Sequence, residues 1–212
     1  MAGLRPSRAE RVALCDLFDA IGPDAPTRCA GWTTADLATH LLVRERYPLA
    51  AIGLVWPSRF GDRLETTYER VLAGRPYAAI VDTVRRGPPA PLRPFDAAMN
   101  LVEYFVHHED VRRGGAATDP RPAAETADLD DALWRTLRTA GRLQTRTLPV
   151  GLDLVRDDGA VLRVHRGAPT ATLTGRPGEL VLYLAGRRRV AQVQLGGVPA
   201  AVTAVQDAAF GV

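Results

Sequence analysis

Polar and ionisable residues between positions 96 and 110 have the spacing of one helix face. Glu103 and His107 are four residues apart, so on an α-helix they lie on the same side. Asp96, Asn100 and Asp110 extend this stripe at alternating intervals of four and three residues. A carboxylate and an imidazole placed in this way can bind one divalent metal ion from the same helix. The stripe therefore predicts a polar interior site.

A metal site needs at least one further protein ligand, and His40 is the best candidate. It follows Thr33 and Asp36, which have the spacing of a capping box at a helix start. His40 shares a helix face with Leu37 and Val43, so its imidazole is expected to point inward. Two imidazoles and one carboxylate leave an open position on Zn²⁺, as in catalytic zinc sites. Zn²⁺ is the expected metal, although Ni²⁺, Co²⁺ and Fe²⁺ accept the same ligands.

The same residues have a purely structural alternative. A Glu and a His four apart are frequent on helices that bind no metal, and an inward His is often a hydrogen-bonded core residue. His108 is about 100° around the helix from His107, so it is expected to face solvent or a neighbouring helix, and a surface role is favoured. Asp110 is expected either to hold an imidazole N–H or to pair with a surface arginine. For His165, in a predicted strand, a surface position and a site position both stay open.

Composition predicts a soluble, cytoplasmic, globular protein. The 212 residues are 46% hydrophobic, which is enough for a core. The net charge of +3 comes from dispersed arginines without any lysine, and the aromatic content is 6%, so nucleic acid is not an expected partner. Cys15 and Cys29 form no disulfide framework. The longest apolar run, at 49–56, is too short to cross a membrane.

The first two thirds of the chain have helical periodicity. Four amphipathic segments with turn-rich connections predict an antiparallel four-helix bundle. The segment 58–87 also has a helical pattern, which is interrupted at 74–76 by Gly-Arg-Pro. A capping box at Ser7 and Glu10 is expected to start the first helix. The four predicted bundle helices are 7–21, 34–56, 95–113 and 128–143.

After Pro149 the periodicity changes from helical to alternating. Three short strands are predicted at 152–155, 161–165 and 170–174, with a hairpin turn between the first two. A short helix at 177–184, a strand at 192–195 and a helix at 198–205 follow. The expected fold is therefore mainly α, with a helical bundle over 1–148 and a small α+β C-terminal domain over 149–212.

Two motifs resemble a known family. The segment from Gly31 to Leu41, GWTTADLATHL, and the segment from Glu103 to Arg112, EYFVHHEDVR, are similar to actinobacterial relatives of mycothiol-dependent maleylpyruvate isomerase. That family belongs to the DinB/YfiT-like superfamily of metal-binding bundles. The resemblance implies a DinB-like bundle and a divalent metal, usually zinc. It also implies that the ligands are His40, Glu103 and His107.

The resemblance further implies a reaction class. We expect a metal-dependent isomerase or transferase that uses a small thiol, mycothiol, on a small electrophilic substrate. Arg44 and Arg187 or Arg188 are candidates to hold a carboxylate of the thiol or substrate, although arginines at 187–189 also suit a helix C-terminus. No further catalytic residue is predicted. The alternatives are a non-catalytic protein that binds a metal or small ligand, and a polar seam with a structural role alone.

Overall fold

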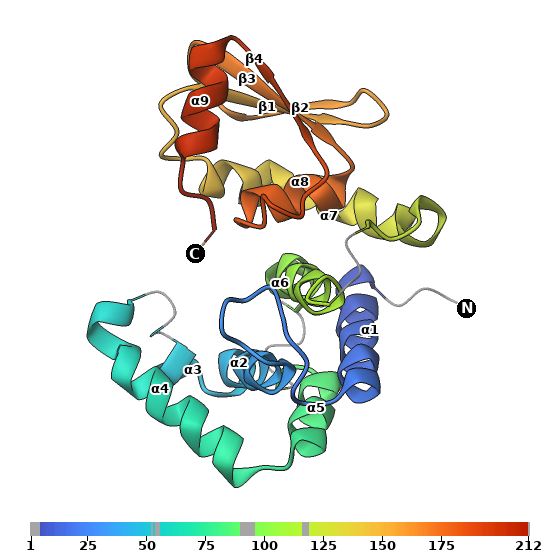
Figure 1. The fold of residues 1–212 in the computed structure, drawn as a ribbon, viewed down its shortest axis with the longest axis vertical. Helices are drawn as coiled ribbons and strands as arrows, with labels where there is room; N and C mark the ends of the chain where they lie inside the picture. Colours follow the sequence, from blue (N-terminus) through green and yellow to red (C-terminus); the bar gives the residue numbers. More distant parts are fainter. Residues whose placement is uncertain (1–4, 52, 54–55, 90–95, 116–118, 212) are drawn as a thin grey trace. The chain divides into compact units, whose positions relative to one another are not determined.

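The computed structural model describes residues 5–51, 53, 56–89, 96–115 and 119–211. The chain divides into two compact units, Met1–Ala117 and Thr118–Val212 (Figure 1). Within the described residues, no helix combines the length and the apolar character that crossing a bilayer requires.

The first unit consists of helices. Helix α1 packs against α5 and α6, and α2 packs against α3, α4 and α5 (Figure 1). These contacts bury an apolar core that includes Leu14, Phe18, Leu37, Leu41 and Ile80. The helices are α1 (Pro6–Ile21), α2 (Thr34–Arg46), α3 (Pro48–Ala51), α4 (Pro57–Gly74), α5 (Tyr77–Arg86) and α6 (Asp96–Arg112).

Local signals explain where these helices begin and end. The capping box at Thr33 and Asp36 is confirmed, because each residue accepts a hydrogen bond from the other's backbone N–H. The capping box predicted at Ser7 is wrong, since Pro6 already occupies the first helical position of α1. Helix α2 does not continue to residue 56 as predicted. It ends at Arg46 because Pro48 disfavours helical backbone at Tyr47 and starts α3.

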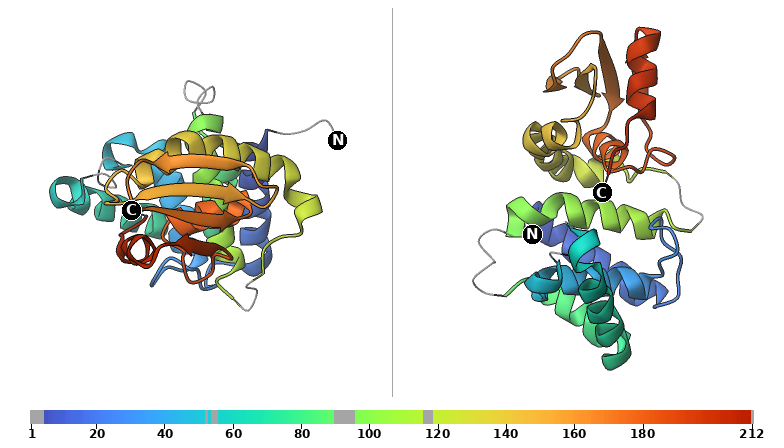
Figure 2. Two further views of the ribbon diagram at one scale, coloured as in Figure 1. Left: turned by 90° about the horizontal axis from the view of Figure 1, so that it is seen from above. Right: turned by 90° about the vertical axis from the view of Figure 1, so that its left-hand side faces the viewer.

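The second unit packs helices on a four-stranded mixed sheet (Figure 2). The strand order is β2-β1-β3-β4, in which β1 and β3 are parallel and the other pairs antiparallel. Its elements are α7 (Ala123–Gln144), β1 (Gly151–Arg156), β2 (Val161–His165), β3 (Thr170–Gly175), α8 (Pro177–Leu184), β4 (Gln194–Gly197) and α9 (Pro199–Asp207). Every element predicted after Pro149 is present, and each boundary agrees with the prediction to within two residues.

Helix α7 is bound to this second unit by specific contacts. It packs against α8 and β2. A Cβ at Gly141 would lie 2.8 Å from Val164 Cγ1, so the glycine permits the close approach of α7 to β2. At the other end of the contact, Asp130 accepts hydrogen bonds from the Arg176 guanidinium at 2.8 Å and from Gly178 N at 3.1 Å.

The predicted mainly α fold with a four-helix bundle is therefore wrong, and the protein is α+β. Two features overturn it. The segment 58–87 forms α4 and α5, which pack on α2 and α1 in the first unit. The expected fourth bundle helix, α7, belongs to the unit that contains the sheet. The sequence placed the domain boundary after this helix, at 148/149, whereas the compact units meet at 117/118.

Candidate metal centre

His40, Glu103 and His107 converge in the first unit, as the sequence predicts. His40 comes from α2, and the other two come from α6. Glu103 Oε1 lies 3.2 Å from His40 Nε2 and 3.3 Å from His107 Nε2. The three ligand atoms all lie within 4.8 Å of one another, so the group could hold a metal ion.

The donor spacing fits a tetrahedral ion. Bonds of about 2.0–2.1 Å at tetrahedral angles separate a nitrogen and an oxygen ligand by about 3.3 Å. The two measured separations between imidazole nitrogen and carboxylate oxygen, 3.2 and 3.3 Å, match that value. Both imidazoles are about nine-tenths buried, whereas the Glu103 side chain is 25% exposed. The group is therefore enclosed on the histidine side and accessible near the carboxylate.

Each histidine is oriented through its second ring nitrogen. His40 Nδ1 lies 2.8 Å from the Tyr68 hydroxyl of α4, and His107 Nδ1 lies 3.0 Å from Asp110 Oδ2. Such contacts select the ring tautomer and fix the ring plane of metal-binding histidines. Asp110 is almost fully buried, so its carboxylate does not lie at the surface, where the alternative prediction placed it. The Nε2 atoms of both rings are consequently directed at Glu103.

The local charges leave His40 and Glu103 in the protonation states that a metal ion requires, and they favour a competing proton on His107. Burial lowers the pKa of His40 below its ordinary value, so its imidazole is neutral at pH 7. Burial alone would raise the pKa of Glu103, but hydrogen bonds with His107 and His40 and the charge of Arg44 hold it well below its usual range. Burial would lower the pKa of His107, but Asp110, Cys29 and Glu103 together raise it well above the ordinary value. A bound cation would replace a proton on His107.

A network of hydrogen bonds and ion pairs connects Glu103 with the buried pair of Arg11 and Glu45. Arg44 Nε lies 3.3 Å from Glu103 Oε1, and its guanidinium also donates to Asn100. Asn100 in turn donates to Glu45 Oε1 at 3.3 Å. The Glu45 carboxylate also accepts hydrogen bonds from both terminal nitrogens of the Arg11 guanidinium, at 2.7 and 2.9 Å. Arg44, which the sequence predicts to bind an anion, therefore contacts the Glu103 carboxylate of the candidate metal centre and helps to hold it in position.

Other residues singled out in the sequence lie elsewhere. The surface role predicted for His108 is wrong, because its ring is buried and its Nδ1 lies 3.0 Å from Glu10 Oε2 of α1. Asp96 begins α6, but its side chain lies outside the described residues. His165 is in the second unit, where its Nδ1 lies 2.8 Å from the carbonyl oxygen of Val150.

Arg187 and Arg188 also belong to the second unit, where they bond to their own surroundings. Arg187 donates to the carbonyl oxygen of Ala185 at 2.7 Å. Arg188 donates to two carbonyl oxygens near the C-terminal end of α9, and its guanidinium lies 4.6 Å from the ring centre of Phe210. Arg188 therefore has a local structural role in holding the chain end, whereas Arg187 bonds at the end of α8.

Two neighbours of the centre were not identified from the sequence. Tyr68 follows the apolar spacing of α4 with Leu64, so its pattern indicates a core residue and nothing more. Cys29 lies in the loop before α2, and its Sγ is 3.3 Å from Asp110 Oδ2 and 3.9 Å from His107 Nδ1. Cys29, His107 and Asp110 form a second group that could hold a metal ion.

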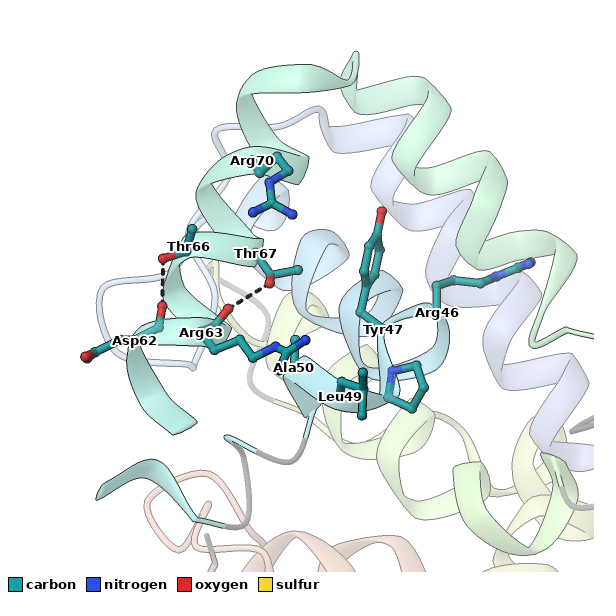
Figure 3. A pocket seen from close by; sticks show the side chains of 10 residues that line it. Arg46, Tyr47, Leu49, Ala50, Asp62, Arg63, Thr66, Thr67 and Arg70 are labelled. Carbon is teal, nitrogen blue, oxygen red and sulfur yellow. Dashed lines mark hydrogen bonds between the residues drawn. The ribbon is translucent and has the colours of Figure 1, made fainter. Parts of the chain in front are cut away.

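A separate pocket of about 560 Å³ lies between the end of α2, α3 and α4 (Figure 3). Its lining carries three arginines and one carboxylate, so it favours anionic over cationic ligands. None of His40, Glu103 and His107 contributes to it. The lining residues are Arg46, Tyr47, Pro48, Leu49, Ala50, Asp62, Arg63, Thr66, Thr67 and Arg70.

Comparison with known proteins adds no relative. No family model, curated protein or solved structure matches this chain.

Proposed function

We propose that this protein binds one divalent metal ion, Zn²⁺ in the first place, through His40, Glu103 and His107. The observation that carries the proposal is the convergence of two Nε2 atoms on Glu103 Oε1 at tetrahedral ligand spacing. The contacts of Tyr68 and Asp110 with the opposite ring nitrogens support it, since they hold both imidazoles in the orientation that ligation needs.

We further propose that the centre works with a small thiol as an isomerase or transferase for a small electrophilic substrate. The motif resemblance to relatives of mycothiol-dependent maleylpyruvate isomerase supports this reaction class, with mycothiol as the thiol. A bound zinc ion with three protein ligands supplies an open position that lowers the pKa of a thiol or water. Glu103 and His107 act as ligands and not as bases.

Arg44 is the residue of this chain best placed to interact with an anionic substrate group near the centre. Its side chain is 22% exposed and lies beside the exposed edge of Glu103. Its bonds to Glu103 and Asn100 hold the guanidinium in place, which favours the orientation of a carboxylate that approaches this cation. In this role Arg44 positions the substrate and takes no part in proton transfer.

A second candidate function is non-catalytic binding of a metal or small ligand. The engagement of the neighbouring polar groups favours it. Tyr68 contacts His40, Asp110 contacts His107, and Arg44 contacts Glu103. Because each of these side chains already contacts one of the three ligand residues, none of them is assigned as a general base.

Titration calorimetry of the metal-free protein with Zn²⁺ tests the metal proposal. We expect one ion at the three-residue group, with affinity reduced in His40→Ala by more than the about 10- to 100-fold that outer partners contribute. His165→Ala is the matched control, because this histidine lies in the second unit, and it should bind as wild type. Equal affinity in wild type and His40→Ala would contradict the proposal.

Turnover separates the two functions. Zinc-loaded protein is incubated with maleylpyruvate and with a panel of small electrophiles, each with and without mycothiol. Thiol-dependent turnover that is lost in His40→Ala supports the enzyme. Metal and thiol binding without turnover of any substrate supports the non-catalytic candidate.

A further inference from the structure

A second set of metal-ligating atoms meets on the opposite side of the His107 ring. Cys29 Sγ, His107 Nδ1 and Asp110 Oδ2 are separated by 3.9 Å (S to N), 3.3 Å (S to O) and 3.0 Å (N to O). A tetrahedral zinc ion would require about 3.6, 3.5 and 3.3 Å for these pairs. The three atoms are therefore within about 0.3 Å of the spacing for thiolate, imidazole and carboxylate ligands.

The loop that carries Cys29 is held against α6 by backbone contacts. Arg28 N donates to the carbonyl oxygen of Asp110 at 2.9 Å, and Cys29 N donates to Thr27 Oγ1 at 3.1 Å. A Cβ at Gly114 would lie 2.2 Å from the carbonyl oxygen of Pro26, so only glycine permits this approach. These contacts hold the backbone at Cys29 close to α6, and this keeps the sulfur near His107 and Asp110.

We propose that Cys29, His107 and Asp110 bind a second, thiophilic divalent cation, with the His107 imidazole bridging the two ions. The proposal rests on the first metal centre, with which it shares His107. The ring would bind the first ion through Nε2 and the second through Nδ1, which places the ions about 6 Å apart. Binding displaces two protons, one from the Cys29 thiol and one from Nδ1, and forms one bond from each of these atoms to the ion.

The chemistry of the ligands determines which cations suit the second position. A thiolate ligand selects zinc, cobalt or cadmium over magnesium and calcium, which prefer all-oxygen sites. Cys29 is partly exposed, so an ion can enter from the side of the loop. Asp110 is 1% exposed, so its carboxylate is shielded from solvent. At low metal content Asp110 accepts the Nδ1 hydrogen of His107; the second ion replaces that hydrogen bond.

Cobalt titration of the metal-free protein tests the proposal. Bound Co²⁺ is counted after dialysis, and absorption reports thiolate ligation through a sulfur-to-cobalt charge-transfer band in the near ultraviolet. Wild type should bind two ions per chain and show the band. Cys29→Ser and Cys29→Ala should bind one ion without the band, while the affinity for that ion stays within about threefold of wild type. Cys15→Ala, which alters a buried cysteine in the core, should behave as wild type.

The outcomes separate this proposal from the first. His40→Ala should lose the first ion and keep the band. A wild type that binds one ion without the band overturns the second site and leaves the first intact. A wild type that binds no ion overturns both. One ion that carries the band and is retained in His40→Ala overturns the two-ion arrangement and places the metal at Cys29.

Discussion

Glu103 Oε1 is the atom on which the candidate centre converges. Two imidazole nitrogens and the Arg44 guanidinium lie 3.2–3.3 Å from it. A carboxylate is stable there because the cationic and hydrogen-bonding neighbours outweigh its loss of hydration. The described side chains of the polar stripe on α6 are thus explained one by one: Asn100, Glu103, His107 and Asp110 each have a partner on another element or on α6 itself.

The Arg11 and Glu45 pair is the buried support of this stripe. Both side chains are at most 4% exposed, and Arg11 also donates to Tyr104. Arg11→Met leaves the Glu45 carboxylate without its main charge partner and should lower the free energy of unfolding by about 3–5 kcal/mol. Urea denaturation followed by circular dichroism measures the change.

The exposed pair of Arg163 and Asp153 provides the matched control. Arg163→Met removes a pair with similar geometry in solvent, where charge pairs contribute little. A loss of stability as large as in Arg11→Met would contradict the role assigned to burial.

Cys15 predicts a dependence of stability on alkaline pH. Burial raises the pKa of its thiol from 9.0 to about 12. The unfolded thiol therefore ionises above pH 9 while the folded one keeps its proton, so its contribution to stability is fully present below pH 9 and is lost as pH rises toward 12. The stability difference between wild type and Cys15→Ala should shrink by about 1.4 kcal/mol per pH unit over that range. Urea unfolding at pH 8, 9 and 10 measures it; a constant difference would contradict the assignment.

Helix α2 places His40 through a local signal at its start. Thr33 and Asp36 bond reciprocally at the N-terminus, which fixes where the helix begins and hence which residues face inward. Thr33→Ala should cost about 1 kcal/mol of stability. Thr83→Ala is the control, since Thr83 lies in the middle of α5, where its hydroxyl donates to the carbonyl oxygen of Ala79 and accepts from Arg86 but caps no helix end. Thermal unfolding compares the two, and equal losses would contradict the capping role.

Sequence patterns predict elements better than they predict partners. Periodicity located α6, the strands after Pro149 and the break between α4 and α5, because these depend on neighbouring residues. The assignment of α7 to a bundle failed, since an amphipathic helix shows that it has an apolar face but not what covers it. The elements that cover α7 are determined by contacts between residues remote in sequence, such as the close approach of Gly141 to Val164.

The residues of the candidate site also divide into those that the sequence could predict and those that it could not. His40, Glu103 and His107 could be predicted because two follow helical spacing and the third follows a strong helix start. Tyr68 and Cys29 could not, because a tyrosine at core spacing and a cysteine in a loop have no distinctive pattern. The surface role predicted for His108 failed for a related reason: helical rotation places its ring away from His107 but does not reveal that Glu10 of α1 lies opposite.

At the scale of the whole molecule, all the proposed metal ligands belong to the first unit. A bound ion stabilises the state that binds it, so its effect should be concentrated where the ligands are. Zn²⁺ should slow hydrogen exchange in α2, α6 and the loop before α2, and leave β1, β2, β3 and β4 unchanged. Exchange mass spectrometry with and without Zn²⁺ measures this; slowing confined to the sheet would contradict the site.

Anomalous diffraction at the zinc absorption edge, from crystals of zinc-loaded protein, shows whether His40, Glu103 and His107 hold a divalent metal ion. We expect a peak about 2.0–2.2 Å from His40 Nε2, Glu103 Oε1 and His107 Nε2. A zinc-loaded crystal with no peak within bonding distance of these three atoms would contradict this expectation.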